Sequence, residues 1–230
     1  MKIAIIPARA GSIRIKNKNI KLFNGKPAIA WSILAAKKTN LFDRIIVSTD
    51  SNKITQIAKK YGAEVPFIRK KILAKNSVTT IKVIKDAIRN IKSKEAKICC
   101  IYPCAPLIKS KDISNSYKKL KKKIDFVFSA SSFQADIFSS FILSKKNKKI
   151  KIINKKNFNK KSNYRIKKYY DSGQFYWGHQ HSWIKKKDIF KSNVDIFEIP
   201  SWRSQDINTS DDWNVALRLS KIKKYEKNKK

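Results

Sequence analysis

The sequence lacks a long hydrophobic run: its longest apolar stretches cover only a handful of residues, which excludes a membrane-spanning helix. The N-terminus passes from Met-Lys directly into an isoleucine-rich segment without a small-residue cleavage site, so we expect no secretory signal. Only three cysteines are present (Cys99, Cys100 and Cys104), crowded into one predicted strand and its exit. They cannot form a disulfide framework, which predicts a reducing, cytoplasmic location.

Acidic residues are also scarce. Sixteen Asp and Glu oppose 54 Lys and Arg, which gives a formal net charge of +38. Such a charge can serve a polyanionic partner, or it can reflect compositional drift, since Lys, Ile and Asn share A/T-rich codons and are all in excess. The lysines are spread along the whole chain, with no aromatic-interleaved RNA-binding motif and no zinc-finger spacing. We therefore expect no nucleic-acid partner.

The 230 residues are 42% hydrophobic, enough for one sizeable core. Buried-strand patterns at 2–6, 44–48, 97–102, 125–129 and 174–178 alternate with helical patterns at 27–38, 51–61, 81–91, 110–122 and 210–222. This alternation predicts an α/β domain with a mostly parallel sheet. From about residue 134 to 170 the pattern degrades into Lys- and Asn-rich sequence. We interpret this stretch as a small inserted subregion within a single domain spanning 1–230.

The segment after the first predicted strand, Ile6–Asn19, carries the strongest chemical pattern. Its notable members are Arg9, Gly11, Ser12, Arg14, Lys16 and Lys18. Ligands of open α/β sheets bind at the carboxyl ends of the strands. A tight bend at Gly11, backbone N–H groups and several cations suit a nucleotide triphosphate there, and a solvated basic turn is the alternative interpretation. The segment is neither a GxxxxGKS/T phosphate loop nor a GxGxxG fingerprint, which argues against generic NTPase and nicotinamide-binding functions.

The longer segment IPARAGSIRIKNKNIKLFNGKPAIAW (Ile6–Trp31) resembles the signature of the CMP-sugar-acid synthetases, cytidylyltransferases that activate nonulosonic acids with CTP. The resemblance continues in register through RIIVSTD, YGAEVPFIR, IYPCAPL, DSGQFYWG and WRSQDINTSDDW. The Gly-Gln-Phe-Tyr-Trp block and the Tyr of IYPCAPL are similar to the pseudaminic acid branch rather than the sialic acid branch.

The resemblance implies a nucleotide-diphosphosugar transferase-like fold, a Rossmann-like three-layer sandwich, and a homodimer formed through the inserted subregion. It also implies Mg²⁺-dependent transfer of CMP from CTP to the anomeric hydroxyl of a nine-carbon 2-keto sugar acid, with release of pyrophosphate. Such a reaction needs in-line positioning and charge neutralisation more than a strong general base. We therefore interpret His179 and His181 as exposed residues beside a strand end.

Carried over position by position, the resemblance assigns the nucleotide to the first part of the chain. Arg9 and Lys18 would hold the triphosphate, within a loop shaped by Gly11 and Ser12, and Asn19 would hold the ribose. Arg69 and Thr80 would contact the nucleotide at its base. Further along the chain, Tyr102 would lie at the floor of the sugar pocket and Gln174 would face the sugar acid. Asp206, with Asn208, would ligate the metal, so the catalytic residues implied are Arg9, Lys18 and Asp206.

Several positions depart from the family pattern. Ile13 stands where a Lys is usual, so one phosphate contact is lost unless Arg14 supplies it. Asn208 replaces a second metal-binding Asp; its amide oxygen can ligate Mg²⁺ but brings no charge, so metal affinity should fall. Asn76 and Tyr170 replace an acidic residue and a histidine. The alternatives left open are a legionaminic or sialic acid enzyme, and a catalytically impaired relative acting as a binding protein.

Overall fold

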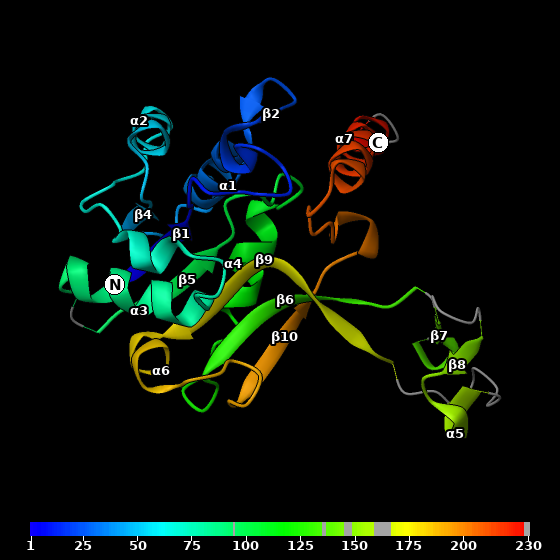
Figure 1. The fold of residues 1–230 in the computed structure, drawn as a ribbon. Coiled ribbons are helices and arrows are strands. Elements are labelled where there is room, and N and C mark those ends of the chain that lie inside the picture. The colour runs from blue at the N-terminus through cyan, green and yellow to red at the C-terminus, as the bar shows by residue number, and fades with distance from the viewer. Residues whose placement is uncertain (94, 135–136, 145–148, 159–166, 228–230) are drawn as a thin grey trace.

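A twisted six-stranded sheet in the order β10-β6-β9-β5-β1-β4 forms the centre of the computed structural model (Figure 1). The structure describes residues 1–93, 95–134, 137–144, 149–158 and 167–227. Its strands are β1 (Lys2–Pro7), β2 (Leu22–Phe23), β3 (Lys26–Pro27), β4 (Arg44–Ser48), β5 (Lys97–Ile101), β6 (Phe126–Ser132), β7 (Phe141–Leu143), β8 (Ile150–Ile152), β9 (Tyr169–His179) and β10 (Val194–Glu198). Its α-helices are α1 (Ala28–Lys37), α2 (Asn52–Lys60), α3 (Thr80–Ile91), α4 (Ser110–Tyr117), α5 (Lys155–Phe158), α6 (Gln180–Lys185) and α7 (Ser210–Lys227).

The sheet is mostly parallel, as predicted. β1 pairs in parallel with β4 and β5, and β6 pairs in parallel with β10. β9 is the exception, because it runs antiparallel between β5 and β6. The carboxyl ends of β1, β4 and β5 therefore open at one edge, where a ligand site is expected.

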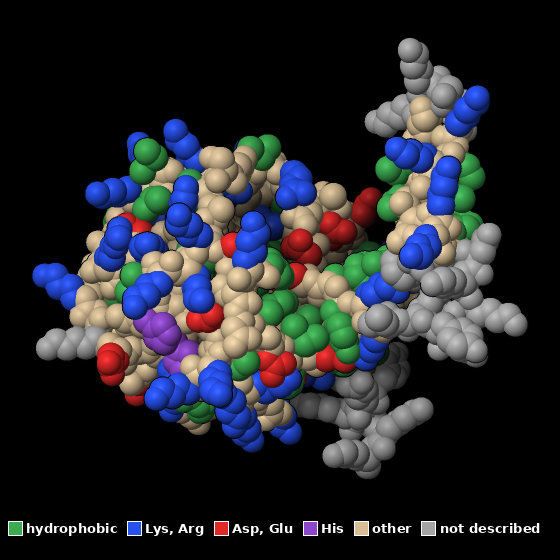
Figure 2. Space-filling model, turned by 90° about the horizontal axis from the view of Figure 1, so that it is seen from below, with side chains coloured by type: hydrophobic (Ala, Val, Ile, Leu, Met, Phe, Trp, Pro, Cys, Tyr) green, Lys and Arg blue, Asp and Glu red, His purple; other side chains and the backbone are tan. Residues whose placement is uncertain are grey.

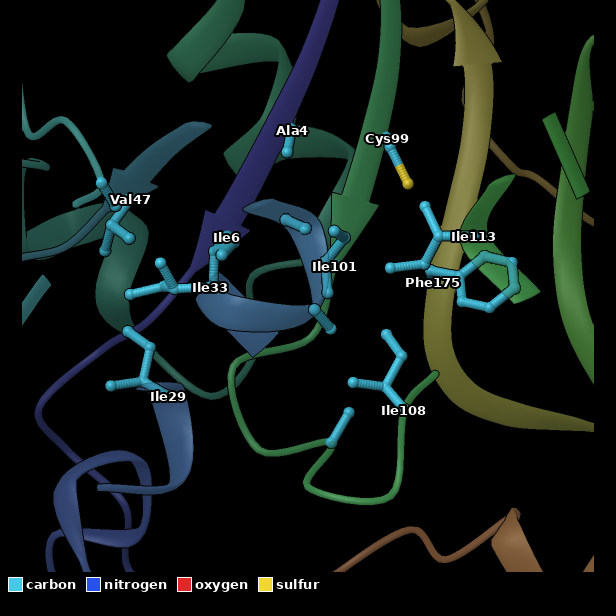
Figure 3. Close-up of a cluster of buried hydrophobic side chains, with 14 of the residues drawn as sticks. Ala4, Ile6, Ile29, Ile33, Val47, Cys99, Ile101, Ile108, Ile113 and Phe175 are labelled. Atoms are coloured by element: carbon cyan, nitrogen blue, oxygen red, sulfur yellow. The ribbon is translucent and has the colours of Figure 1, made fainter. Parts of the chain in front are cut away.

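Side-chain alternation along the strands builds two cores, one on each face of the sheet. Ala4 and Ile6 of β1 pack with α1, α2 and α4, as the close-up of this cluster shows for part of it (Figure 3). Ile3 and Ile5 point to the opposite face and pack with α3 and α6. Helices on both faces of a sheet give the three-layer sandwich that the resemblance implies. Within the described residues, no helix is both long enough and apolar enough to span a bilayer.

A third, smaller cluster fixes the C-terminal part of the chain to the N-terminal loop. Ile207 is 1% exposed and packs in one cluster with Ile15, Phe23 and Leu107. Trp213 of α7 joins the same cluster, edge-on to Phe23 with ring centroids 5.6 Å apart. This packing holds the residues on either side of Ile207 beside the loop that follows β1.

Some helix ends follow from local sequence signals, and others do not. Ser51 caps α2 by accepting a bond from Ile54 N (3.4 Å), and Gly62, at φ +85°, follows its end. The helix predicted over 110–122 begins as expected at Ser110 but ends early, because α4 stops at Tyr117. The lysine run that follows places like charges three and four residues apart, which opposes further helix. Helix α6 and strand β10 follow no pattern that was predicted from the sequence.

The hairpin β7–β8 and the helix α5 extend away from the sheet (Figure 1). They fall within the predicted inserted subregion of about 134–170, of which 135–136, 145–148 and 159–166 lie outside the described residues. Phe141, Leu143 and Ile150 are 54%, 54% and 62% exposed. Figure 2 shows Lys and Arg side chains scattered across the face seen from below.

Candidate active site

A cavity of about 270 Å³ lies between the loop after β1, the segment before α3 and the carboxyl end of β5. Several residues singled out from the sequence line it together: Arg9, Ser12, Lys18, Asn19, Arg69, Thr80 and Tyr102. The rest of its lining includes Lys75, Asn76 and Pro103. Arg9 and Tyr102, which are 93 positions apart in the sequence, thus meet at the sheet edge expected to bind a ligand.

The cavity is strongly cationic. Arg9, Lys18, Arg69 and Lys75 all contribute to it, and the lining formed by the described residues includes no carboxylate. The Arg9 side chain is oriented by a bond from Nη1 to the carbonyl of Ala74 (3.3 Å). Several converging cations with donors to spare are the arrangement that binds a polyphosphate.

Arg69 is the most deeply buried of these cations, at 4% exposure. Its Nε and Nη2 atoms have no hydrogen-bond partner among the described residues, although Nη2 lies 3.9 Å from Asp50 Oδ1. Burial lowers the pKa of Arg69, while the nearby Asp50 opposes the shift and Arg9 adds to it. A buried guanidinium with open donors is costly unless a ligand satisfies it, so the cavity is suited to a ligand that presents acceptors at this point.

Asp50 is a contributor that the sequence analysis missed. Its Oδ1 accepts a bond from Ala10 N (2.9 Å), so one carboxylate both supports Arg69 and holds the loop after β1. The signal was its place two residues beyond Ser48, at the carboxyl end of β4. Asn19, 5% exposed, supports the same loop by donating to the carbonyl of Arg9 (2.9 Å).

Gly11 lies in this loop but is not required by its geometry. Its φ is not left-handed, and a Cβ atom there would meet nothing within 4 Å. Gly11 is the middle residue of a tight turn, as expected, although no steric limit reserves the position for glycine. Ser12 N donates to the carbonyl of Ala10 (2.8 Å), which makes the local turn.

The structure brings the loop and the distant 206–208 segment together. Lys18 Nζ donates to the carbonyl of Ile207 (2.6 Å), whose side chain is anchored in the third cluster. Cys104 lies near both Lys18 and Asp206. Burial raises the pKa of Cys104 to about 11, the charge of Lys18 opposes this shift, and the charge of Asp206 adds to it. Lys18 and Asp206 thus open onto the same part of the molecule rather than onto separate faces.

Arg14 reaches the same segment. Its Nη2 donates to Asn208 Oδ1 (2.8 Å), and Asn208 Nδ2 donates to Asp206 Oδ2 (2.6 Å). Ile13, by contrast, is 79% exposed. Arg14, the cation next to Ile13, therefore faces Asn208 in this structure.

Gly173 of β9 brings Tyr102 and Asp206 close to one point of the backbone. A Cβ atom on Gly173 would lie 3.8 Å from the Tyr102 ring and 3.9 Å from the Asp206 carboxylate, so these groups surround one glycine. Gln174 points elsewhere: it is 2% exposed and donates through Nε2 to the carbonyl of Arg203 (2.6 Å). Its Oε1 has no partner among the described residues.

The two histidines lie away from this cavity. The rings of His179 and His181 stack with centroids 5.3 Å apart and line a separate hollow of about 380 Å³ with Glu95 and Lys97. Lys97 begins β5, so this hollow is at the amino end of that strand, opposite the edge where ligands of such sheets bind. Of the other departures, Asn76 lines the cationic cavity, and Tyr170 packs against Phe133 (centroids 5.0 Å apart).

The donor set near Asp206 fits a magnesium ion shared with phosphate, rather than one caged by protein alone. Asp206 is an exposed carboxylate beside the cationic cavity, and Asn208 adds an amide oxygen. No group of three or more His, Cys, Asp or Glu side chains suited to a metal occurs among the described residues. Mg²⁺ commonly binds through one or two carboxylates together with substrate phosphates and waters.

The chain is similar to known proteins along nearly its whole length. The sequence profile of a family described as "Cytidylyltransferase" matches residues 3–229. A pseudaminic acid cytidylyltransferase of Campylobacter jejuni is 35% identical over 96% of both chains. A CMP-N,N'-diacetyllegionaminic acid synthase of Legionella pneumophila is 36% identical over 50% of each chain. A solved structure titled CMP:2-keto-3-deoxy-manno-octonic acid synthetase complexed with CTP is similar in fold, with a TM-score of 0.74 and 12% identity, covering 97% of this chain and all of that one.

Proposed function

The chain belongs to the cytidylyltransferase family, and we propose that it transfers CMP from CTP to the anomeric hydroxyl of a nonulosonic acid, with pseudaminic acid as its substrate. The observation that carries this proposal is the cationic cavity at the end of β1, with Asp206 held beside it through Ile207. Legionaminic and sialic acids are the alternative acceptors within the same reaction.

In this reaction the anomeric oxygen forms a bond to the α-phosphorus, and the bond from that phosphorus to the bridging oxygen of pyrophosphate breaks. The hydroxyl proton leaves to solvent or base, and pyrophosphate takes up the negative charge of the broken bond. Arg9 and Lys18, both from the loop after β1, would bind phosphate oxygens. Arg69 would donate hydrogen bonds to the nucleotide through its unpaired nitrogens. Fixed cations around a transferring phosphoryl group stabilise charge as it develops.

We assign the metal to Asp206, with the Asn208 amide oxygen as its second protein donor. When bound, Mg²⁺ would neutralise phosphate charge and lower the pKa of a coordinated hydroxyl. In the structure the Asn208 oxygen accepts a bond from Arg14, so it would have to exchange that partner to serve as a ligand. Arg14 would then be free to approach the phosphates, in the place of the lysine that Ile13 has replaced.

Pseudaminic acid is preferred over its alternatives because its enzyme combines a similarity along nearly the whole chain with the higher identity over that length. The pseudaminic acid enzyme of Campylobacter jejuni aligns over 96% of this chain, including the segments that hold Tyr102 and Asp206. The Legionella legionaminic acid synthase aligns over only 50%. A sialic acid relative, the N-acylneuraminate cytidylyltransferase of Escherichia coli, aligns over 98% of the chain but at 25% identity.

Pyrophosphate release tests the proposal directly. The protein is incubated with CTP and Mg²⁺, and pseudaminic, legionaminic or sialic acid is added in separate reactions. We expect release only when a sugar acid is present, and fastest with pseudaminic acid. Release with none of the three, at protein concentrations near those of the substrates, would refute the proposed reaction. CTP binding without release would instead favour an impaired relative that acts as a binding protein.

We also propose that the projecting hairpin joins two copies of the chain. Phe141 and Leu143 are two residues apart on β7, and Leu143 pairs with Ile150 of β8, so the three lie on one face of the hairpin. All three are more than half exposed, which is unusual for a cluster without a partner. Phe141→Lys should convert a dimer to a monomer in light scattering; a wild-type monomer at micromolar concentration would refute this.

We place the enzyme in the cytoplasm, where its proposed substrate CTP is made. The cysteines Cys99, Cys100 and Cys104 are free thiols in the structure, in keeping with a reducing compartment.

A further inference from the structure

The Asp50 carboxylate joins two segments that line the cationic cavity without lining it itself. Its Oδ1 accepts a bond from Ala10 N (2.9 Å), in the loop after β1, and lies 3.9 Å from Arg69 Nη2. Arg9, next to Ala10, and Arg69 both belong to the described lining of the cavity, and Asp50 does not. Asp50 therefore acts on a ligand in the cavity only through its neighbours.

Backbone contacts fix Asp50 and Arg69 relative to each other. Arg69 N donates to the carbonyl of Thr49 (2.8 Å), next to a parallel bridge between Thr49 and Ile68. On the other side of Asp50, Ser51 N donates to Thr49 Oγ1 (3.2 Å), and Ser51 caps α2. The backbone on both sides of the carboxylate is thus held in place without a ligand.

The distance between the two charges is informative. At 3.9 Å the Asp50 oxygen is too far from Arg69 Nη2 for a hydrogen bond, but the opposite charges still attract each other. Because the same oxygen is bonded to Ala10 N, the carboxylate cannot move closer without losing that bond. Arg69 Nε and Nη2 accordingly have no hydrogen-bond partner among the described residues. Asp50 attracts the guanidinium and leaves its donors open.

Arg69 depends on this carboxylate for its place inside the protein. It is 4% exposed, and Asp50 is its only ion-pair partner within the described residues. Burial lowers the pKa of Arg69, Asp50 opposes the shift more than Asp86 does, and the like charge of Arg9 adds to it. A buried cation without a counter-charge is costly, so without Asp50 the guanidinium should turn toward water.

We infer that Asp50 is a positioning residue that keeps Arg69 inside the cavity with its donors free for the nucleoside part of CTP. This inference rests on the proposed function, in which Arg69 contacts the nucleotide at its base. It predicts an effect of unusual sign. Removing a negative charge beside a cationic cavity should strengthen the binding of an anion through general electrostatics, whereas the loss of a positioning residue should weaken CTP binding.

Asp50→Asn tests the inference, because an amide oxygen can still accept from Ala10 N while the charge is lost. Calorimetry without a sugar acid measures the dissociation constants of CTP and of inorganic triphosphate. We expect CTP binding to weaken about tenfold and triphosphate binding not to weaken, since triphosphate has no nucleoside for Arg69. CTP binding as tight as in the wild type, or tighter, would overturn the inference. An equal weakening of both ligands would also overturn it, because that marks damage to the loop.

Asp43→Asn is the matched control. Asp43 lies before the opposite end of β4, and its Oδ2 likewise accepts from a backbone donor, Lys2 N (2.6 Å). The control removes the same charge away from the cavity, so neither ligand should bind more weakly. A tenfold loss of CTP binding in this variant too would contradict a specific role for Asp50.

A double-mutant cycle shows whether Asp50 acts through Arg69. Asp50→Asn should lower the urea midpoint of unfolding and weaken CTP binding in the wild type, and do neither in an Arg69→Met background. Equal losses in both backgrounds would contradict the inference. If Asp50→Asn alone does not fold, the double variant must fold, because it no longer buries an unpaired cation. Failure of both to fold would place the role of Asp50 elsewhere.

The outcome is separable from that of the proposed function. If the wild type releases pyrophosphate with a sugar acid but Asp50→Asn binds CTP normally, only the inference fails. If the wild type binds CTP and no sugar acid releases pyrophosphate, the proposed reaction fails, while the two dissociation constants and the cycle still decide the role of Asp50.

Discussion

The two halves of the central sheet differ in whether their buried arginine is paired with a carboxylate. Around β4, β1 and β5, Arg69 is almost fully buried yet keeps two nitrogens without a hydrogen-bond partner among the described residues. Beside β9, β6 and β10, Arg203 is equally buried but forms an ion pair with the Asp112 carboxylate of α4. The first half holds a cation whose donors remain open to a ligand, and the second uses its cation to hold the protein together.

This contrast suggests how stability and binding are divided in the molecule. A buried charge without a partner lowers stability, and a site can retain it because the ligand completes its bonds. Substitutions in the half around β4, β1 and β5, where we place the nucleotide, should therefore change CTP binding more than folding. Substitutions at the paired charges of the other half should do the reverse. The following variants test that division, in order of decreasing effect.

Arg203→Met should have the largest effect on folding. It would leave the Asp112 carboxylate, 8% exposed, without its buried partner, and such losses lower the free energy of unfolding by about 3–5 kcal/mol. Arg69→Met removes a cation that is incompletely paired, so its loss of stability should be much smaller. Urea unfolding compares the two. Equal losses, or a greater loss for Arg69→Met, would contradict the division.

Lys18→Met should have the largest effect on CTP binding. The loss of a charged hydrogen-bond donor to phosphate weakens binding by about 1.5–3 kcal/mol, which is roughly 10- to 150-fold. Lys16→Met is the control, because Lys16 is an exposed residue of the same loop that does not belong to the described lining of the cavity. Calorimetric titration with CTP measures both. If the two variants weaken binding equally, general charge rather than the cavity attracts the nucleotide.

Asn208→Asp should have a moderate effect, on magnesium alone. A second carboxylate beside Asp206 increases the charge available to a divalent cation, so the Mg²⁺ concentration that half-saturates CTP binding should fall several-fold. Asn90→Asp adds the same charge on the exposed end of α3, away from the cavity. If both variants respond alike, or neither responds, Asn208 is not at the metal. A rise in turnover for Asn208→Asp or Ile13→Lys would indicate what these departures cost the enzyme.

The smallest effect concerns the tyrosines that separate the two halves. Burial raises the pKa of Tyr102 to about 12, and it raises that of Tyr176 further. Their neutral forms therefore favour the folded state up to about pH 10, the ordinary tyrosine value. Above that, the unfolded chain ionises first, so stability should fall as the pH rises from about 10 towards 12. Ultraviolet titration should show these two of the eight tyrosines ionising after the others; early ionisation of all eight would contradict their burial.

The elements around β4, β1 and β5 were predicted well because their signals are local. The buried run of β1, the cationic loop and the helical pattern at 27–38 all lie within the first quarter of the chain, and each depends on neighbouring residues. The meeting of Arg9 with Arg69 required only the general rule that ligands gather at the carboxyl ends of parallel strands.

The other half was harder because its structure depends on long-range pairing. β9 was predicted only over 174–178, whereas it extends back to Tyr169 as a partner of β6. Gln174, expected to face the sugar acid, is turned toward the Arg203 backbone. The rings of Tyr176 on β9 and Tyr102 after β5 lie against each other, with centroids 5.5 Å apart. No spacing along the sequence indicates that contact.

The central claim is that the cavity after β1 binds the triphosphate, while Asp206, far away in the sequence, binds the magnesium ion. A crystal structure of the protein with CTP and Mg²⁺ tests it most directly. The account predicts triphosphate density between Arg9 and Lys18, the cytosine ring near Arg69 and Thr80, and Asp206 bound to the metal. Nucleotide density in the hollow beside His179 and His181, or a metal bound without Asp206, would contradict it.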